Sequence, residues 1–425
     1  MQTIKYPVKE IWNEILKRPS FDTVSLESSV QLILDDIKTN GQSAVNKYTL
    51  QFDNVNIENV RVSPYEFALA EKQISIELKT SIQLAKNNIE KFHSAQKEEF
   101  KIIETTPGVS CWRKSIAVQK VGLYIPGGTA PLFSTILMLG VPAKLAGCQE
   151  IILCTPPDAN GNINSAILYT AQLIGITKVF KIGGVQAIGA MAYGTEDLPQ
   201  VYKIFGPGNQ YVTCAKQLIN KQGVAIDMPA GPSEVAILAD ETCVPKFVAA
   251  DLLSQAEHGS DSQVILVSTS EMVIKTIQIE LEKQLAVLPR KEFAAKALDN
   301  SKAILVNTNS EAIELLNEYA PEHLIISCND DEQLAEQVLN AGSVFLGNYS
   351  CESAGDYASG TNHTLPTNGY AKAYSGVSLD SFVKKITYQK LTKEGIQNIG
   401  PAIELMAEAE GLQAHKNAVT IRLNN

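Results

Sequence analysis

The chain has 425 residues, of which 45% are hydrophobic and 19% charged, so it can bury a large apolar core and should fold as two to four compact units. Lys and Arg total 36 against 46 for Asp and Glu, and the formal net charge of −10 leaves no general basic surface for a phosphate backbone. This balance argues against nucleic acid as a partner.

The start of the chain shows no signal for export, because charged residues interrupt its apolar ones. The most apolar stretch, residues 132–141, is too short to span a bilayer. Seven scattered cysteines form no Cys-x-x-Cys pair, which argues against a disulfide framework or a thiolate zinc site. We therefore expect a cytoplasmic protein with no membrane segment.

Residues 1–120 are predicted to be largely helical, since apolar residues recur at three- and four-residue spacing in 30–52 and again in 65–92. The one histidine of this region, His93, fits a solvated or capping role. We expect the region to pack against residues 234–375.

From residue 121 onward, short apolar runs alternate with helical segments, which is typical of βαβ units and of a parallel sheet buried on both faces. We predict an α/β fold with two Rossmann-like parallel-sheet domains, 121–233 and 234–375. The predicted strands are VGLYIP, EIILCTPP and KVFKIGG in the first domain, and SEVAILAD, SQVILVST, KAILVNT, HLIIS and SVFLG in the second.

The tail, residues 376–425, is predicted to be helical. Its apolar positions, such as Phe382, Ile386 and Ile403, need something to cover them. Either an oligomer partner or the tail's own domain could do so.

Two glycine-rich segments, VGLYIPGGTAP and KIFGPGNQYV, follow apolar strands, as phosphate-binding turns require. The second offers Gly206 and Gly208 but has Tyr211 where a third glycine would fall, so the ordinary dinucleotide fingerprint is absent. The spacing of these glycines is equally compatible with cofactor binding and with a tight, closely packed turn.

The segment DLLSQAEHG is predicted to end a helix that begins near Pro245, with Gly259 at its end. Gln255 and His258 would then lie in the final turn and share one face. An amide oxygen and an imidazole could hold a cation there, or the two side chains could cap the helix.

Glu322 and His323 come just before an apolar strand. Consecutive residues of a regular strand point to opposite faces, so the two can act together only if the backbone after Pro321 is irregular. Together they could abstract a proton or activate water. The alternative is a surface acid beside a strand-end histidine.

The polar segment CESAGDYASGTNHTLPT lies between an apolar strand and the tail. Asp356 in this segment could be an anionic metal ligand, with hydroxyl and amide groups orienting it. Ordinary turn chemistry would explain the same composition.

Taken together, these motifs resemble the histidinol dehydrogenase family. The match runs in order from about residue 121 to the tail, whereas the first hundred residues add only compatible length and helical character. The segments that carry it are VGLYIPGGTAPLFSTILM, GGVQAIGAMAYG, KIFGPGNQYV, IDMPAGPSEV, DLLSQAEHG, APEHL, ESAGDYASGTNHTLPT and EGLQAH.

The resemblance implies oxidation of L-histidinol to L-histidine, the last step of L-histidine biosynthesis, in two NAD-dependent steps through an aldehyde that stays bound. It also implies one zinc ion per site, which orients the substrate by binding its imidazole and amino nitrogens. The implied zinc ligands are Gln255, His258, Asp356 and His415.

Residue roles follow from the same resemblance. His323 resembles the family's base for the alcohol proton, and Glu322 the residue that activates water on the aldehyde. The implied substrate-binding residues are Ser233, Gln255, His258, His323, Asp356, Glu410 and His415, and the implied NAD contacts are Tyr124, Gln186 and Asn209.

The resemblance further implies a homodimer in which the tail of one chain brings Glu410 and His415 into the partner's site. Two alternatives stay open. One is a related zinc and NAD dehydrogenase of another small polyol, such as a sulfonated diol. The other is a metal-binding or regulatory protein that has kept the scaffold without turnover.

Overall fold

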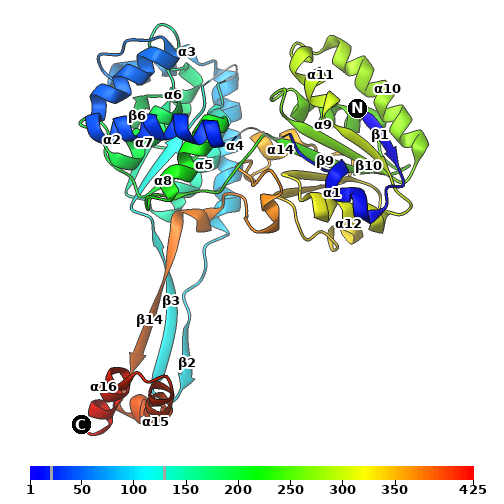
Figure 1. Ribbon diagram of the computed structural model, residues 1–425. Helices are drawn as coiled ribbons and strands as arrows, with labels where there is room; N and C mark the ends of the chain where they lie inside the picture. The colour runs from blue at the N-terminus through cyan, green and yellow to red at the C-terminus, as the bar shows by residue number, and fades with distance from the viewer. Residues whose placement is uncertain (20–22, 128–130) are drawn as a thin grey trace.

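The computed structural model describes residues 1–19, 23–127 and 131–425. Two groups of helices and strands lie side by side, and a long arm leads away from them to the C-terminal helices (Figure 1). Within the described ranges, no helix is both long enough and apolar enough to cross a membrane.

The first group is built on a five-stranded parallel sheet with the strand order β6-β5-β4-β7-β8. The order runs outward from β4 in both directions, which is the doubly wound arrangement with its switch point between β4 and β7. The strands are β4 (Lys120–Tyr124), β5 (Glu150–Thr155), β6 (Lys178–Lys181), β7 (Lys203–Phe205) and β8 (Ala225–Ile226).

Helices cover both faces of this sheet. One core joins α3 (Pro64–Gln73), α4 (Ile76–Ser94), α5 (Phe133–Ala146) and α6 (Ser165–Leu173) to the sheet. The other core joins α2 (Thr23–Asp53), α7 (Gly184–Tyr193) and α8 (Gln210–Asn220) to it.

The expectation that residues 1–120 pack against 234–375 is wrong for most of this region. Val30, Leu34 and Ile37 of α2 are buried with residues of α7, and Ile82 and Ile89 of α4 are buried in the other core of the first sheet. These apolar stripes at helical spacing complete the two cores of the first sheet, so burial of apolar surface decides where the helices lie.

The first residues of the chain join the second group. Strand β1 (Gln2–Lys5) pairs in parallel with the edge strand β11, and Trp12 of the short helix α1 (Trp12–Ile15) is buried in the core on one face of that sheet.

The second sheet is also parallel and has the order β1-β11-β10-β9-β12-β13, with the switch point between β9 and β12. The strands predicted from continuous apolar runs are present in both sheets, which confirms the α/β class with parallel sheets. Here they are β9 (Glu234–Ala239), β10 (Gln263–Ser268), β11 (Lys302–Leu305), β12 (His323–Ser327) and β13 (Ser343–Leu346).

The helices of the second group again lie on both faces. Cores form beneath α9, α10 and α11 on one side and beneath α1 and α12 on the other. The bounds are α9 (Pro245–Ala256), α10 (Glu271–Val287), α11 (Lys291–Asp299), α12 (Asn309–Tyr319), α13 (Asp331–Ala335) and α14 (Glu352–Tyr357), and short 3-10 helices lie at Lys9–Ile11, Tyr370–Lys372 and Leu379–Phe382.

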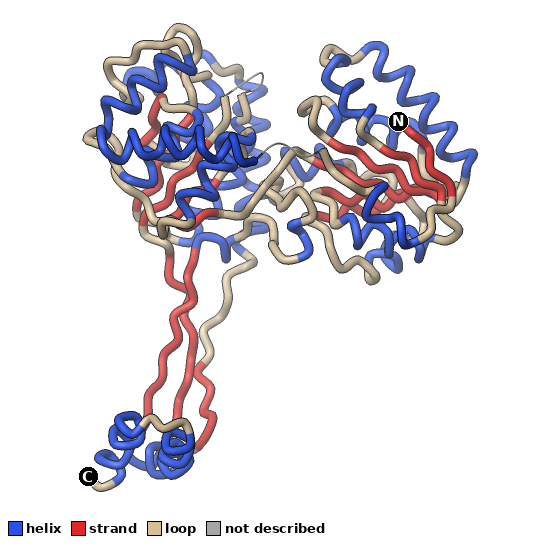
Figure 2. Tube along the Cα trace, viewed as in Figure 1, coloured by secondary structure: helices blue, strands red, loops and turns tan. Residues whose placement is uncertain are grey.

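The arm is a three-stranded antiparallel sheet in the order β14-β3-β2, drawn red in Figure 2. Its strands are β2 (Ile102–Thr106), β3 (Val109–Ala117) and β14 (Val383–Leu391). The sequence predicted helix for residues 376–425 and a largely helical 1–120, and these strands correct both predictions. Cross-strand pairs such as Trp112 with Tyr388, whose rings stack 5.5 Å apart, stabilise the pairing of strands distant in the sequence.

Helices α15 (Lys393–Ala409) and α16 (Gln413–Leu423) pack against each other at the far end of the arm (Figure 1). Large apolar side chains stay uncovered there: Leu405, Met406 and Ile421 are 68%, 66% and 59% exposed. An exposed apolar group of this kind is typical of a surface that another molecule covers.

Candidate active site

Glu322 and His323 lie at the amino end of β12, which is placed between β9 and the edge strand β13 in the second sheet, and both are buried. The chain reaches them from Ala320, whose left-handed backbone (φ +51°) interrupts regular structure just before Pro321. Glu322 itself follows Pro321 as a bend outside the regular strand, which begins at His323, so the irregular backbone expected after Pro321 is present. His323 Nδ1 lies 3.7 Å from Glu322 Oε2, so the two side chains face one another.

The main chain of one residue of the neighbouring strand, Glu234, holds both side chains. The Glu234 N–H donates to Glu322 Oε2 at 2.9 Å, and the Glu234 carbonyl oxygen lies 3.1 Å from His323 Nδ1. Because a carbonyl only accepts, His323 carries its hydrogen on Nδ1. The other nitrogen, Nε2, is buried and has no hydrogen-bond partner among the described residues, and Asp356 Oδ1 lies 3.6 Å from it.

Three side chains beside this pair could hold a metal ion: ligand atoms of His258, Glu352 and Asp356 all lie within 4.8 Å of one another. Sequence reasoning proposed His258 and Asp356 but missed Glu352. The signal was present, because Glu352 and Asp356 are four residues apart and share one face of α14.

Gln255 is buried next to this group, in the last turn of α9 as predicted. Its amide fits between the Glu234 N–H, from which its oxygen accepts at 2.7 Å, and Glu352, to which its nitrogen donates. His258 differs from prediction, since α9 ends at Ala256 and His258 follows the helix on an exposed turn. That turn still brings the ring to Asp356.

Buried carboxylates control the charge of His323. Burial alone lowers the pKa of the ring, but three neighbouring carboxylates raise it more, to about 10. They belong to Glu352, Glu322 and Asp356. Burial raises the pKa of Glu322 to about 7 and that of Glu352 well above its ordinary value. The pKa of Asp356 falls instead, since the His323 ring outweighs burial.

Asp251, one turn before Gln255 on α9, provides a test of this buried environment, because burial raises its pKa to about 7 from 3.8. The folded state therefore favours the protonated acid, and the stability that this gives is present below about pH 4 and lost as the pH rises through about 7. Asp251→Asn avoids that loss. We expect its unfolding free energy to gain about 2–4 kcal/mol relative to the parent protein between pH 4 and pH 8.

Chemical denaturation of both proteins at several pH values measures this difference. Asp299→Asn, at an exposed position of the same unit, is the matched control and should show no such trend. A stability difference for Asp251→Asn that stays constant with pH would contradict the buried, protonated acid.

The three implied NAD contacts lie at the carboxyl edge of the first sheet. The Tyr124 hydroxyl accepts from the Gly184 N–H at 3.1 Å, and Gln186 Nε2 donates to Asp53 at 3.1 Å. Asn209 caps α8, accepting two backbone N–H bonds. Tyr124 and Gln186 are both buried. Asp53, a half-buried acid in contact with Gln186, was not singled out from the sequence.

The second glycine-rich segment is a tight turn at the same edge. Gly206 has φ +128°, and a Cβ there would lie 2.0 Å from the Tyr124 carbonyl oxygen, so only glycine fits. The buried Lys216–Asp227 ion pair binds both the carbonyl and the N–H of Gly206. Close packing thus explains this glycine without a ligand.

A pocket of about 580 Å³ lies between the two sheets. Gly208 and Asn209 line it from the first unit, and Arg18, Tyr319 and Asn368 line it from the second. The carboxyl edge of the first sheet therefore faces the amino edge of the second sheet across this pocket. Ser233 lies on the connection that enters β9, directly before Glu234.

Glu410 and His415 do not join this group. They lie at the far end of the arm, at the end of α15 and in α16, both exposed and well away from α9 and α14 (Figure 1). One chain therefore assembles three of the four implied zinc ligands.

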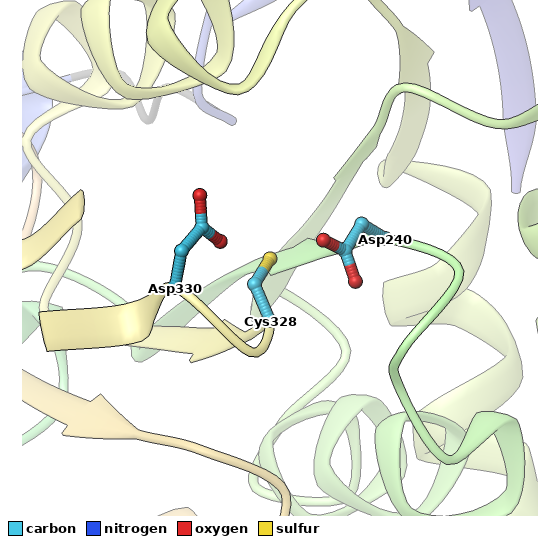
Figure 3. A group of neighbouring side chains, drawn as sticks. All are labelled: Asp240, Cys328 and Asp330. Atoms are coloured by element: carbon cyan, nitrogen blue, oxygen red, sulfur yellow. The ribbon is translucent and has the colours of Figure 1, made fainter. Parts of the chain in front are cut away.

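A second group of possible ligands, Asp240, Cys328 and Asp330, lies at the carboxyl ends of β9 and β12 (Figure 3). Burial raises the pKa of the Cys328 thiol, whereas metal binding needs the thiolate. Nothing else at this group points to a ligand.

Two doubly wound units with a buried acid–imidazole pair and candidate metal ligands define an α/β enzyme. An acetylating aldehyde dehydrogenase from Geobacillus thermoglucosidasius, at 13% identity and a TM-score of 0.50 over 89% of this chain and 94% of that one, shares the fold alone. The model of the family Histidinol dehydrogenase matches residues 16–423, and the chain belongs to this family.

Relatives match over nearly the whole length. A histidinol dehydrogenase of Bacteroides thetaiotaomicron is 62% identical, covering 100% of this chain and 99% of its own. A chloroplastic histidinol dehydrogenase of Arabidopsis thaliana is 50% identical, covering 97% and 89%. The crystal structure of histidinol dehydrogenase from Elizabethkingia anophelis has a TM-score of 0.98 at 58% identity, covering 100% and 98%.

Proposed function

We propose that the chain oxidises L-histidinol to L-histidine, the last step of L-histidine biosynthesis, in two NAD-dependent steps through a bound aldehyde. The chain belongs to the histidinol dehydrogenase family, and one structural observation carries the proposal. The buried Glu322–His323 pair lies directly beside His258 and Asp356. Residues 121–233 would form the NAD-binding domain, and 234–375 the zinc and substrate domain.

His323 is the proposed base for the alcohol proton. Its Nδ1 hydrogen is held by the Glu234 carbonyl, which leaves the unpartnered Nε2 to accept a proton from substrate. Glu322, whose pKa is raised to about 7 by burial, would accept the proton of the water that adds to the aldehyde. The hydrate then carries the second hydride, which leaves for NAD.

The donor set suits zinc. A neutral imidazole, a carboxylate and an amide oxygen from His258, Asp356 and Gln255 are ligands that zinc accepts, with His415 as the fourth. Bound zinc would supply a positive charge that orients the substrate's imidazole and amino nitrogens. A cation held by Asp356 would also offset one carboxylate that raises the pKa of His323, which favours the neutral ring that a base requires.

Substrate and cofactor would then meet between the two sheets. Ser233 precedes β9 beside the catalytic pair, and the carboxylate of Glu410 suits the substrate's ammonium group. Tyr124, Gln186 and Asn209 lie at the carboxyl edge of a doubly wound sheet, where such folds bind nucleotides.

The active form is proposed to be a homodimer with shared sites. Glu410 follows α15 and His415 lies in α16, and these two helices stand at the end of an arm that leads away from α14, the helix of Asp356 (Figure 1). A second chain would supply these two residues, and its contact would cover the exposed Leu405 and Met406. A cytoplasmic location agrees with seven cysteines that are all free.

Purified protein mixed with histidinol and excess NAD should form about two NADH per histidine, because both oxidations occur at one site. Absorbance of NADH and chromatography of histidine measure the ratio. Dialysis against a chelator should abolish the reaction, and added zinc should restore it. NADH formation from a sulfonated diol but not from histidinol would favour the alternative enzyme. A ratio well above two NADH per histidine, with free aldehyde in solution, would contradict the bound intermediate.

A further inference from the structure

We propose that Arg18 and Glu234 are positioning residues that fix His323 and Glu322 for the reaction. This inference rests on the function proposed above. Neither residue need touch the substrate, because both act through the main chain at Glu234.

The main chain of Glu234 is a common anchor for three site residues. Its carbonyl oxygen binds His323 Nδ1 at 3.1 Å, and its N–H lies 2.9 Å from Glu322 Oε2 and 2.7 Å from the Gln255 amide. A small shift of the main chain at Glu234 would therefore displace the base, the acid and a proposed zinc ligand together. Reacting groups tolerate little displacement: an error of about 1 Å can cost about 10²-fold in rate.

The position of the main chain at Glu234 depends on the Glu234 side chain. Glu234 is the first residue of β9, so the chain before it is a connection outside the sheet. Its carboxylate is 2% exposed and accepts hydrogen bonds from both Nε and Nη2 of Arg18, the latter at 2.8 Å, and from the Asn368 N–H at 2.8 Å. This two-point contact fixes orientation as well as distance.

Arg18 is itself held firmly, although it comes from the N-terminal segment far from Glu234 in the sequence. Its Nη2 donates to the Tyr319 carbonyl oxygen at 2.7 Å, and its guanidinium stacks 4.0 Å from the centre of the Tyr319 ring. Tyr319 ends α12, the helix that leads into Glu322 and His323. Arg18 thus connects the amino end of β9 with the amino end of β12, where the proposed catalytic pair lies.

The test compares Arg18→Met, Arg18→Lys and Glu234→Gln with the parent protein, all zinc-loaded and below their unfolding temperatures. For Arg18→Met we expect single-turnover NADH formation from histidinol to slow about 10- to 100-fold while KM changes less than about threefold. Arg18→Lys, which keeps the charge but not the two-point contact, should recover part of the rate. Glu234→Gln should fall between the parent and Arg18→Met.

Two further measurements separate positioning from stability alone. A crystal structure of Arg18→Met should show His323 Nδ1 beyond hydrogen-bonding distance of the Glu234 carbonyl. Lys178→Met is the matched control, since it removes the cation of the Lys178–Glu150 pair at the amino edge of the first sheet, and its rate should match the parent's.

Lower melting temperatures with parent-like single-turnover rates for Arg18→Met and Glu234→Gln would overturn the proposal. An unmoved His323 in Arg18→Met would do the same. Absence of NADH formation by the parent protein is a different result, because it refutes the proposed function, while the crystal structure of Arg18→Met still tests the link between Arg18 and His323.

Discussion

Replacing His323 with Asn should lower kcat for histidinol oxidation about 10²- to 10⁴-fold, the contribution typical of a general base. Asn can still donate to the Glu234 carbonyl, but it offers no basic nitrogen in place of Nε2, the buried atom that lacks a partner. The alcohol proton then has no acceptor when hydride leaves. Initial rates of NADH formation at saturating histidinol and NAD measure the effect.

His93→Asn is the control for this variant. His93 is equally buried but lies in α4, where it contacts Gln96 and no residue of the site. Its kcat should equal that of the parent protein in any preparation that is folded. Parent-like turnover by His323→Asn would remove His323 from the role of base.

Mixing two inactive variants should restore activity if the sites are shared between chains. His323→Asn damages the body of the site, and His415→Ala damages the arm, so each homodimer should be nearly inactive. In a mixed dimer, one site combines two damaged parts and the other combines two intact ones. Random assembly makes half of the dimers mixed, so co-refolded protein should show about a quarter of the parent activity.

The rate of NADH formation, measured before and after mixing, shows whether activity is restored. Native mass spectrometry of the same mixture, with an affinity tag on one of the two variants, should show about half of the dimers at an intermediate mass, which calibrates chain exchange. A mixture of His323→Asn and His415→Ala that is no more active than its components, while that calibration succeeds, would show that each chain uses its own arm.

The two parallel sheets could be predicted because their strands are continuous apolar runs, which only burial on both faces explains. The arm could not. Its strands are mostly exposed, and β14 is held by pairing with β3, about 270 residues earlier, so local periodicity carries little information about it. The packing of α2 and α4 depends equally on distant partners, since the apolar stripe of a helix does not show which of the two sheets the helix covers.

The site shows the same division. Spacing alone placed Gln255 at a helix end and allowed Glu322 and His323 to act together, and the structure brings these residues close. Asp356 was grouped with His258 only through the family resemblance, because about a hundred residues separate them. Glu234 escaped notice because a buried acid at a strand start is indistinguishable in sequence from a surface acid, whereas Glu352 was missed although its spacing to Asp356 places both on one face of a helix.

The proposed catalytic pair, Glu322 and His323, lies at the amino edge of the second sheet, whereas doubly wound folds usually bind ligands at the carboxyl edge. Under the proposed function, the turns that follow β9, β10 and β12 therefore carry no catalytic or binding residue. They are the positions where an engineer can graft a reporter domain or an immobilisation tag, on the side of the sheet opposite the reacting atoms. The loops that enter these strands are the ones to leave unaltered.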